Sequence, residues 1–128
     1  MTNDLDDFPT VVHFSKVAQE VESEKGPNAL FALFEHDDNP GRWDLVVAAD
    51  WITRTDRSTI NYFIDKIRRY VPQPSPMNLS GVIVLKPTDH FVQAVLHSLP
   101  PQSQRQGIVH KAFSSLGLSD AYIITAAP

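Results

Sequence analysis

The chain has 128 residues, of which 42% are hydrophobic and 20% are charged, and it contains no cysteine. A chain of this size and composition is typical of a single globular domain with one hydrophobic core. The lack of cysteine excludes disulfides, thiolate metal sites and cysteine nucleophiles, and the net charge of −4 argues against general nucleic-acid binding.

The chain begins with an acidic segment, residues 1–8, which we expect to be a disordered tail, and we expect residues 9–128 to form the single domain. The tail has no apolar core of the kind that signal peptides carry, and no apolar run approaches the roughly 20 residues that span a bilayer. We therefore expect a soluble, cytoplasmic protein.

The first half of the domain is predicted to be a helix followed by two strands. Apolar residues recur at three- and four-residue spacing over residues 10–25, which predicts a helix that ends at Gly26. Residues 29–35 and 43–49 are apolar segments that predict two strands, and the short polar loop between them favours an antiparallel hairpin.

The middle of the chain alternates between the helical and the extended pattern. The clearest amphipathic pattern predicts a helix over residues 58–71, with Asp56 or Ser58 as its N-cap. The run Gly81–Leu85 is apolar throughout, which predicts a strand covered on both faces. A further helix is expected from Asp89 to about Leu99.

The C-terminal region allows two interpretations. Residues 103–118 fit a helix ended by Gly117, and they also fit a strand that enters a hairpin; the cleaner four-residue spacing favours the helix. Residues 121–125 predict a final strand. The expected order is α-β-β-α-β-α-(α or β)-β, an α/β domain (with α+β as the alternative class) whose helices pack on a mixed sheet of four or five strands.

The motifs of common nucleotide and metal enzymes are absent from the sequence. The five glycines fit neither the dinucleotide-binding pattern nor the P-loop pattern. None of the five histidines forms a His-x-x-x-His pair on a predicted helix, and His36-Asp37-Asp38 is better interpreted as a solvated turn than as a metal site. We therefore predict neither a metal nor a cofactor.

Glu35 and Asp44 are candidates for a catalytic carboxylate pair. They flank the predicted hairpin and could face each other across it, as two-carboxylate hydrolysis requires. However, no lysine follows either acid at the spacing that metal-dependent nucleases use. We favour the interpretation of Asp44 as an outward-facing polar residue on an alternating strand.

A candidate binding site lies where two predicted strands end. Strands 43–49 and 81–85 are joined through a helix, so we expect them to be parallel neighbours with adjacent carboxyl ends, where ligands bind in open α/β sheets. Both loops lead into helix N-termini, which attract phosphate or carboxylate groups. The simpler interpretation is that Asp56 and Asp89 cap the helices and that Trp51 packs on the core. The candidate ligand-binding residues are Asp50, Trp51, Arg54, Arg57, Lys86, Thr88, Asp89 and His90.

Helix 58–71 offers a second candidate surface, with bases that could contact phosphates and tyrosines that could stack on nucleobases. A solvated helix face is the favoured interpretation. The residues concerned are Arg57, Lys66, Arg68, Arg69, Tyr62 and Tyr70.

Charge is distributed unevenly along the chain. Residues 1–50 carry eleven acids and three bases, a net −8, whereas residues 51–128 carry four acids and eight bases, a net +4. The favoured interpretation is a chance distribution of charge over solvated faces. The alternative is that segments of opposite charge attract each other between copies of the chain.

No catalytic signature emerges, so the favoured function is a non-catalytic interaction module whose partner is another protein or a second copy of the chain. One alternative is a metal-dependent hydrolase or nuclease that uses Asp44, Asp50 or Asp89 with His90. The other is a domain that binds a small anionic ligand through the loops at 50–57 and 86–90. Nucleic-acid and membrane partners are not expected.

Overall fold

The computed structural model describes residues 9–36, 42–71, 78–98, 107–110 and 118–126. The predicted turn at 37–41, the tail at 1–8, the proline-rich connection at 72–77 and the predictions for 99–106 and 111–117 lie outside these ranges. The predicted α/β class, with helices packed on a mixed sheet, is confirmed. In chain order the elements are α1 (Pro9–Lys25), β1 (Leu30–His36), β2 (Arg42–Ala48), α2 (Arg57–Tyr70), β3 (Asn78–Leu85), α3 (His90–Ser98), β4 (Gly107–His110) and β5 (Leu118–Ala126).

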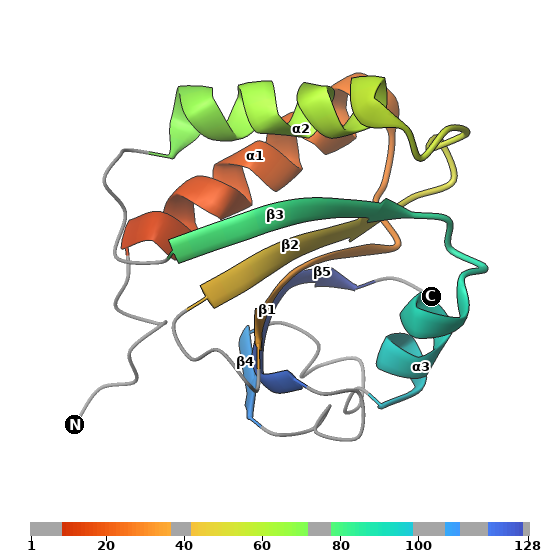
Figure 1. Ribbon diagram of the computed structural model, residues 1–128. Helices are drawn as coiled ribbons and strands as arrows, with labels where there is room; N and C mark the ends of the chain where they lie inside the picture. The colour runs from red at the N-terminus through yellow and green to blue at the C-terminus, as the bar shows by residue number, and fades with distance from the viewer. Residues whose placement is uncertain (1–8, 37–41, 72–77, 99–106, 111–117, 127–128) are drawn as a thin grey trace.

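The strands of the described chain form one sheet in the order β3-β2-β1-β5-β4 (Figure 1). β1 and β2 form the predicted antiparallel hairpin. β2 and β3 are parallel, as predicted from the helix that joins them, and Ala48 lies opposite Leu85 where the two strands end. β5 runs antiparallel to both β1 and β4. The carboxyl ends of β2 and β3 therefore lie side by side.

The favoured prediction for the C-terminal region is wrong. Residues 107–110 form the strand β4, which pairs with β5 from Gly107 opposite Ile123 to His110 opposite Asp120. The helical spacing of this segment depends only on its own residues. The strand, in contrast, is stabilised by hydrogen bonds to β5. β5 in turn pairs with β1, which lies far away in the sequence. Such tertiary pairing overrides local periodicity.

α1 and α2 lie together on one face of the sheet (Figure 1). The predicted apolar stripe of α1 is buried there, together with apolar residues of α2. Odd-numbered residues of β1 and β2 supply the other side of this core, because successive side chains of a strand point to opposite faces. The largest fully buried members are Phe14, Phe31, Leu33, Leu45 and Phe63.

α3 covers only part of the opposite face. Its buried residues Val92, Val95 and Leu96 pack against β5 and the even-numbered residues of β1 and β2. The helix has nine residues, which span about 14 Å at 1.5 Å per residue. Ile83 of β3 remains 40% exposed on this face. The prediction that strand 81–85 is covered on both faces is therefore wrong: Val82 and Val84 pack on the α1–α2 face, whereas Ile83 lies outside the cluster that α3 buries.

Local sequence decides where the helices begin and end. Gly26 has a φ of 117°, and its N–H donates to the Glu22 carbonyl at 3.0 Å, so this glycine ends α1 as predicted. Asp56, one of the two predicted N-caps, accepts a hydrogen bond from the Thr59 N–H at 3.3 Å at the start of α2.

Within the described ranges, no helix combines the length and the apolar character that crossing a membrane requires.

Candidate functional site

The two loops that follow β2 and β3 meet at a cavity of about 270 Å³. It is lined by Thr55 from the first loop, by Leu85 at the end of β3, and by Lys86, Thr88 and Asp89 from the second loop. The structure thus brings together Lys86, Thr88 and Asp89 of the predicted ligand-binding set. Thr55 and Leu85 also line the cavity but are not in that set, although Thr55 belongs to the predicted loop 50–57.

The other predicted ligand-binding residues do not line this cavity. Trp51 packs on α2, with its ring centroid 5.9 Å from that of Tyr62 and 5.7 Å from that of Phe63. The Arg54 side chain is 78% exposed, and its Nε lies 3.0 Å from Oδ2 of Asp56. The remaining members of the set, Asp50, Arg57 and His90, are exposed.

Both helix N-termini at this edge already hold a carboxylate. Asp56 accepts hydrogen bonds from the Ser58 hydroxyl at 2.9 Å and from the Thr59 N–H, and these bonds hold the pKa of Asp56 below its usual range. At α3, the Phe91 N–H donates to Asp89 at 2.8 Å. A capping carboxylate satisfies free N–H groups and offsets the positive end of the helix dipole. The helix ends therefore attract a bound anion less than uncapped ends would.

The proposed carboxylate pair is wrong. Glu35 lies opposite Trp43 and Asp44 lies opposite Phe34 in the β1–β2 register. Because opposite residues share a face and successive residues alternate between faces, Glu35 and Asp44 lie on different faces of the sheet. Among the residues that the structure describes, no group of three acidic or histidine side chains is placed to hold a metal ion.

The predicted basic surface of α2 is largely a contact with α1. The Lys66 side chain is 10% exposed and binds both Glu20 and Glu24, with Nζ 2.8 Å from Oε2 of Glu24. The Tyr62 hydroxyl donates to Glu24 at 2.6 Å, and the Tyr70 hydroxyl donates to Glu20. The hydrogen bonds from Lys66 and the tyrosines hold the pKa of both glutamates below the usual range, and burial raises the pKa of Tyr62 to about 12.

The uneven charge of the sequence thus has a role within one chain, since acids of α1 pair with a base of α2. Arg69 also approaches this group, with Nη1 3.9 Å from Oε2 of Glu20. Both tyrosine hydroxyls are bound to carboxylates, and the Tyr62 ring contacts Trp51 edge to face. Of the residues predicted to contact nucleic acid, only Arg57, Arg68 and Arg69 keep exposed side chains.

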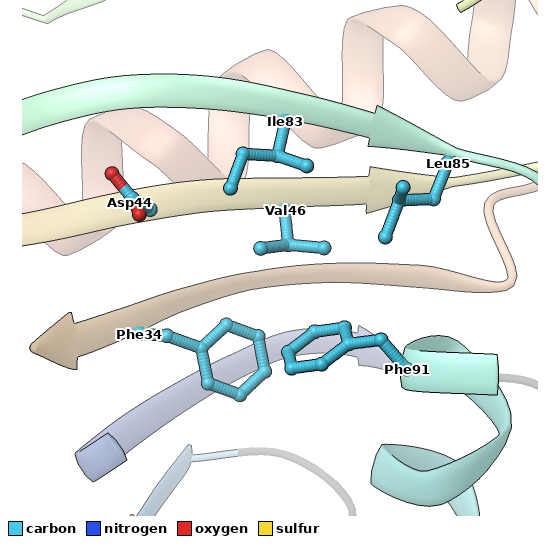
Figure 2. A pocket seen from close by; sticks show the side chains of 6 residues that line it. All are labelled: Phe34, Asp44, Val46, Ile83, Leu85 and Phe91. Atoms are coloured by element: carbon cyan, nitrogen blue, oxygen red, sulfur yellow. The ribbon is translucent and has the colours of Figure 1, made fainter. Parts of the chain in front are cut away.

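A second cavity lies on the half-covered face, beside β3, and has a volume of about 170 Å³. The rings of Phe34 and Phe91 meet edge to face at its base, with centroids 5.7 Å apart. Asp44 is half-buried at one end of the row of side chains and faces away from the buried Trp43 and Leu45, as the alternation of the strand predicts (Figure 2). The described residues that line the cavity are Phe34, Asp44, Val46, Ile83, Leu85 and Phe91 (Figure 2).

Gly81 places no side chain beside the carboxylate of Asp44. The two residues lie opposite each other in the β2–β3 register, and Oδ1 of Asp44 is 3.7 Å from the position that a Cβ on Gly81 would occupy. At this position β3 therefore has no side chain between the carboxylate and the outer edge of the described sheet. Sequence reasoning missed this second cavity because its apolar residues are indistinguishable from core residues. The one relevant feature of the sequence is the apolar run 81–85, because in the structure this run lies in β3 at the edge of the described sheet.

Together these features define a small α/β domain in which, over the described residues, two helices cover one face of the mixed sheet and one helix covers part of the other. Comparison with protein-family models, with curated proteins and with solved structures finds no match for the chain. The side chains around the two cavities are therefore what bears on function.

Proposed function

We propose that this protein is a non-catalytic interaction module that binds an extended segment of a partner protein along β3. The observation that carries the proposal is the apolar cavity beside this strand, where Ile83 is 40% exposed. Within the described sheet, β3 is paired on one side only. An edge strand offers backbone N–H and C=O groups with which a further strand can pair.

The size of the cavity suits one side chain better than a separate small molecule. Its volume is about 170 Å³, whereas pockets for drug-sized ligands measure roughly 300–1,000 Å³. A cavity of roughly 150 Å³ is enough for a benzene-sized group. An apolar side chain of the partner would therefore fill it and be removed from water, which favours binding.

β3 is also the better of the two sheet edges for such pairing. It has eight residues, whereas β4 at the other edge has four. In strand addition, main-chain hydrogen bonds along the edge supply affinity, and pockets for alternate side chains supply specificity. A long edge beside an apolar cavity combines both contributions. The absence of cysteine supports our further proposal that the module acts in the cytoplasm.

The test is selection from a phage-displayed library of random octapeptides, the length of β3, on the immobilised full-length protein. We expect enriched peptides, and we expect Ile83→Ser to weaken their binding by at least about tenfold, which corresponds to about 1.4 kcal/mol. Val12→Ser is the matched control, because Val12 is also an exposed apolar residue, 57% exposed, but lies on α1. No enrichment, or equal binding to Ile83→Ser, would overturn the proposal.

A second copy of the chain is the alternative occupant, and sedimentation of the protein alone distinguishes it. A dimer that Ile83→Ser dissociates and Val12→Ser leaves intact would assign this face to self-association instead of to a partner protein. A monomer at micromolar concentration is the result that we expect.

The anion-binding alternative depends on the larger cavity, where Thr55, Lys86 and Thr88 converge. A rise in melting temperature with inorganic phosphate, removed by Lys86→Ala, would support this function, because a ligand of the folded state raises the stability. The carboxylates of Asp56 and Asp89 at the nearby helix ends lead us to expect no such rise.

A further inference from the structure

We propose that the partner segment carries a lysine or arginine two residues away from the apolar side chain that fills the cavity, and that Asp44 binds this basic side chain. The inference rests on the proposed function and specifies the chemistry of the partner. It follows from three features of β3 and β2: the alternation of side chains along β3, the position of Asp44, and the absence of a side chain at Gly81.

The alternation of β3 sets the spacing. Val82 and Val84 pack on the α1–α2 face, whereas Ile83 and Leu85 line the cavity on the other face. A strand paired with β3 presents every second side chain to the cavity face. The partner residue opposite Ile83 therefore lies beside the cavity, and the next partner residue on the same face lies opposite Gly81.

The position opposite Gly81 is where a charge on the partner meets Asp44. Neighbouring strands lie about 4.8 Å apart, so Gly81 is the only residue between the added strand and Asp44 at this level. A long basic side chain can cross a glycine to reach the carboxylate, whereas a larger residue on β3 would block its path. The carboxylate has two oxygens with about four lone-pair positions, so it can accept this donor in addition to others.

The surroundings of Asp44 strengthen the preference for a cation. The other described walls of the cavity are apolar, and a partner strand over them would exclude water from the carboxylate. Charges attract and repel more strongly where water is excluded. An aspartate or glutamate opposite Gly81 would be repelled by the carboxylate of Asp44, so the same residue also disfavours acidic segments.

The direction of the added strand decides the order of the two residues but not their spacing. A segment parallel to β3 would place the basic residue before the apolar one, and an antiparallel segment would place it after. Both orders keep one residue between them, and both agree with the inference.

The experiment is to pan the same octapeptide library against the wild-type protein, Asp44→Asn, Asp44→Lys and Gly81→Val. We expect the wild-type protein to enrich a basic residue two positions from an apolar one. Asp44→Asn should lose the basic preference, and Asp44→Lys should change it to an acidic preference at the same position. Gly81→Val should also lose the basic preference, although Asp44 is still present, because the valine side chain would stand between the carboxylate and the partner.

Gly81→Val also tests whether the basic preference depends on access to Asp44 and not on a change in the fold. The Cβ position at Gly81 meets Asp44 at an ordinary contact distance of 3.7 Å, so the backbone tolerates a side chain there. Each variant is first checked for a cooperative thermal transition, and one that fails is replaced by Asp44→Ser or Gly81→Thr.

The outcomes distinguish this inference from the proposed function. Enriched peptides that depend on Ile83 but show no charge preference would overturn the inference and leave the interaction module in place. A basic preference that persists in Asp44→Asn would also overturn it. If the wild-type protein enriches no peptides, both the inference and the proposed function fail.

Discussion

The two faces of the sheet are built from the same strands but are closed in different ways. One face is covered by helices of 17 and 14 residues that are joined by the contacts of Lys66 with two glutamates. In the part of the chain that the structure describes, the other face carries one helix of nine residues. Adjacent residues of β2 show the result: Leu45 is fully buried, and Asp44 lines an open cavity. On the residues that the structure describes, the same strands are therefore deeply buried on one face and only partly covered on the other.

The largest expected effect comes from truncating the core of the covered face. Phe63 is fully buried and contacts Trp51 and Tyr62, so Phe63→Ala should lower the free energy of unfolding by about 3–5 kcal/mol. Urea denaturation measures this loss. A cost below about 1 kcal/mol would show that the α1–α2 face is less well packed than described, and the contrast between the two faces would fail.

The next effect tests the polar contact between α1 and α2. Lys66→Met leaves the carboxylates of Glu20 and Glu24, one helical turn apart, without their shared cation, so the melting temperature at neutral pH should fall. Arg68→Met is the control, because Arg68 is an exposed base on the same helix and its loss should change little. Equal effects of the two substitutions would contradict the role assigned to Lys66.

The pH dependence of this contact has a definite sign. Glu20 and Glu24 have pKa values below their ordinary 4.5 in the fold, so their contribution is complete above that pH and is lost as the pH falls through the lowered values. The difference in melting temperature between the wild-type protein and Lys66→Met should therefore narrow in acid.

A second pH dependence is expected in base. The fold raises the pKa of Tyr62 from 10.0 to about 12, so stability should fall as the pH rises across that interval. Melting curves recorded from acid to base check both limits, and a difference that stays constant in acid would count against the prediction.

A smaller effect compares two glycines, one beside each face. Gly26 ends α1 with a φ of 117°, and no atom lies within 4 Å of the position that a Cβ would take there, so Gly26→Ala should cost about 1–2 kcal/mol through backbone strain alone. Gly81→Ala should cost less, because its added methyl makes only an ordinary contact with Asp44. Chemical denaturation of both variants measures the difference, and the reverse order would refute the assignment of Gly26 as a helix-ending residue.

The smallest expected effect is at the half-covered face. Ile83→Ser should lower the free energy of unfolding by about 1 kcal/mol, because a side chain that is 40% exposed contributes only part of the roughly 1.5–3 kcal/mol of a fully buried one. Denaturation alongside Phe63→Ala provides the comparison. A cost near that of Phe63→Ala would mean that Ile83 acts mainly in stability, and its effect on peptide binding would then need a second substitution to interpret.

Much of the fold could be predicted from local pattern. The stripe of α1, the glycine that ends it and the aspartate that caps α2 follow from spacing and from the hydrogen-bonding capacity of single side chains. The parallel pairing of β2 and β3 follows from the helix between them. Of the candidate site, this reasoning located the edge at which Lys86, Thr88 and Asp89 meet, but it wrongly grouped Trp51 with them, since the aromatic contacts that orient Trp51 come from α2.

The failures have a common cause. The helical spacing of residues 107–110 is a property of that segment alone, whereas its strand pairing depends on β5. The distribution of charge along the chain was visible, but the pairing of Glu20 with Lys66 depends on two helices lying side by side. Glu35 pairs with Trp43, one position before Asp44, so Glu35 and Asp44 lie on opposite faces of the sheet. The loop between the two strands does not reveal this register.

By itself, the sequence determined the class of the fold, the order of most of its elements and the ends of its helices, because these depend on interactions among residues a few positions apart. Only the tertiary structure decided which face is left open, which charges neutralise one another and where Asp44 meets an apolar cavity. These depend on how far α3 extends over the sheet and on which strand stands at its edge, and both are set by contacts between residues far apart in the chain.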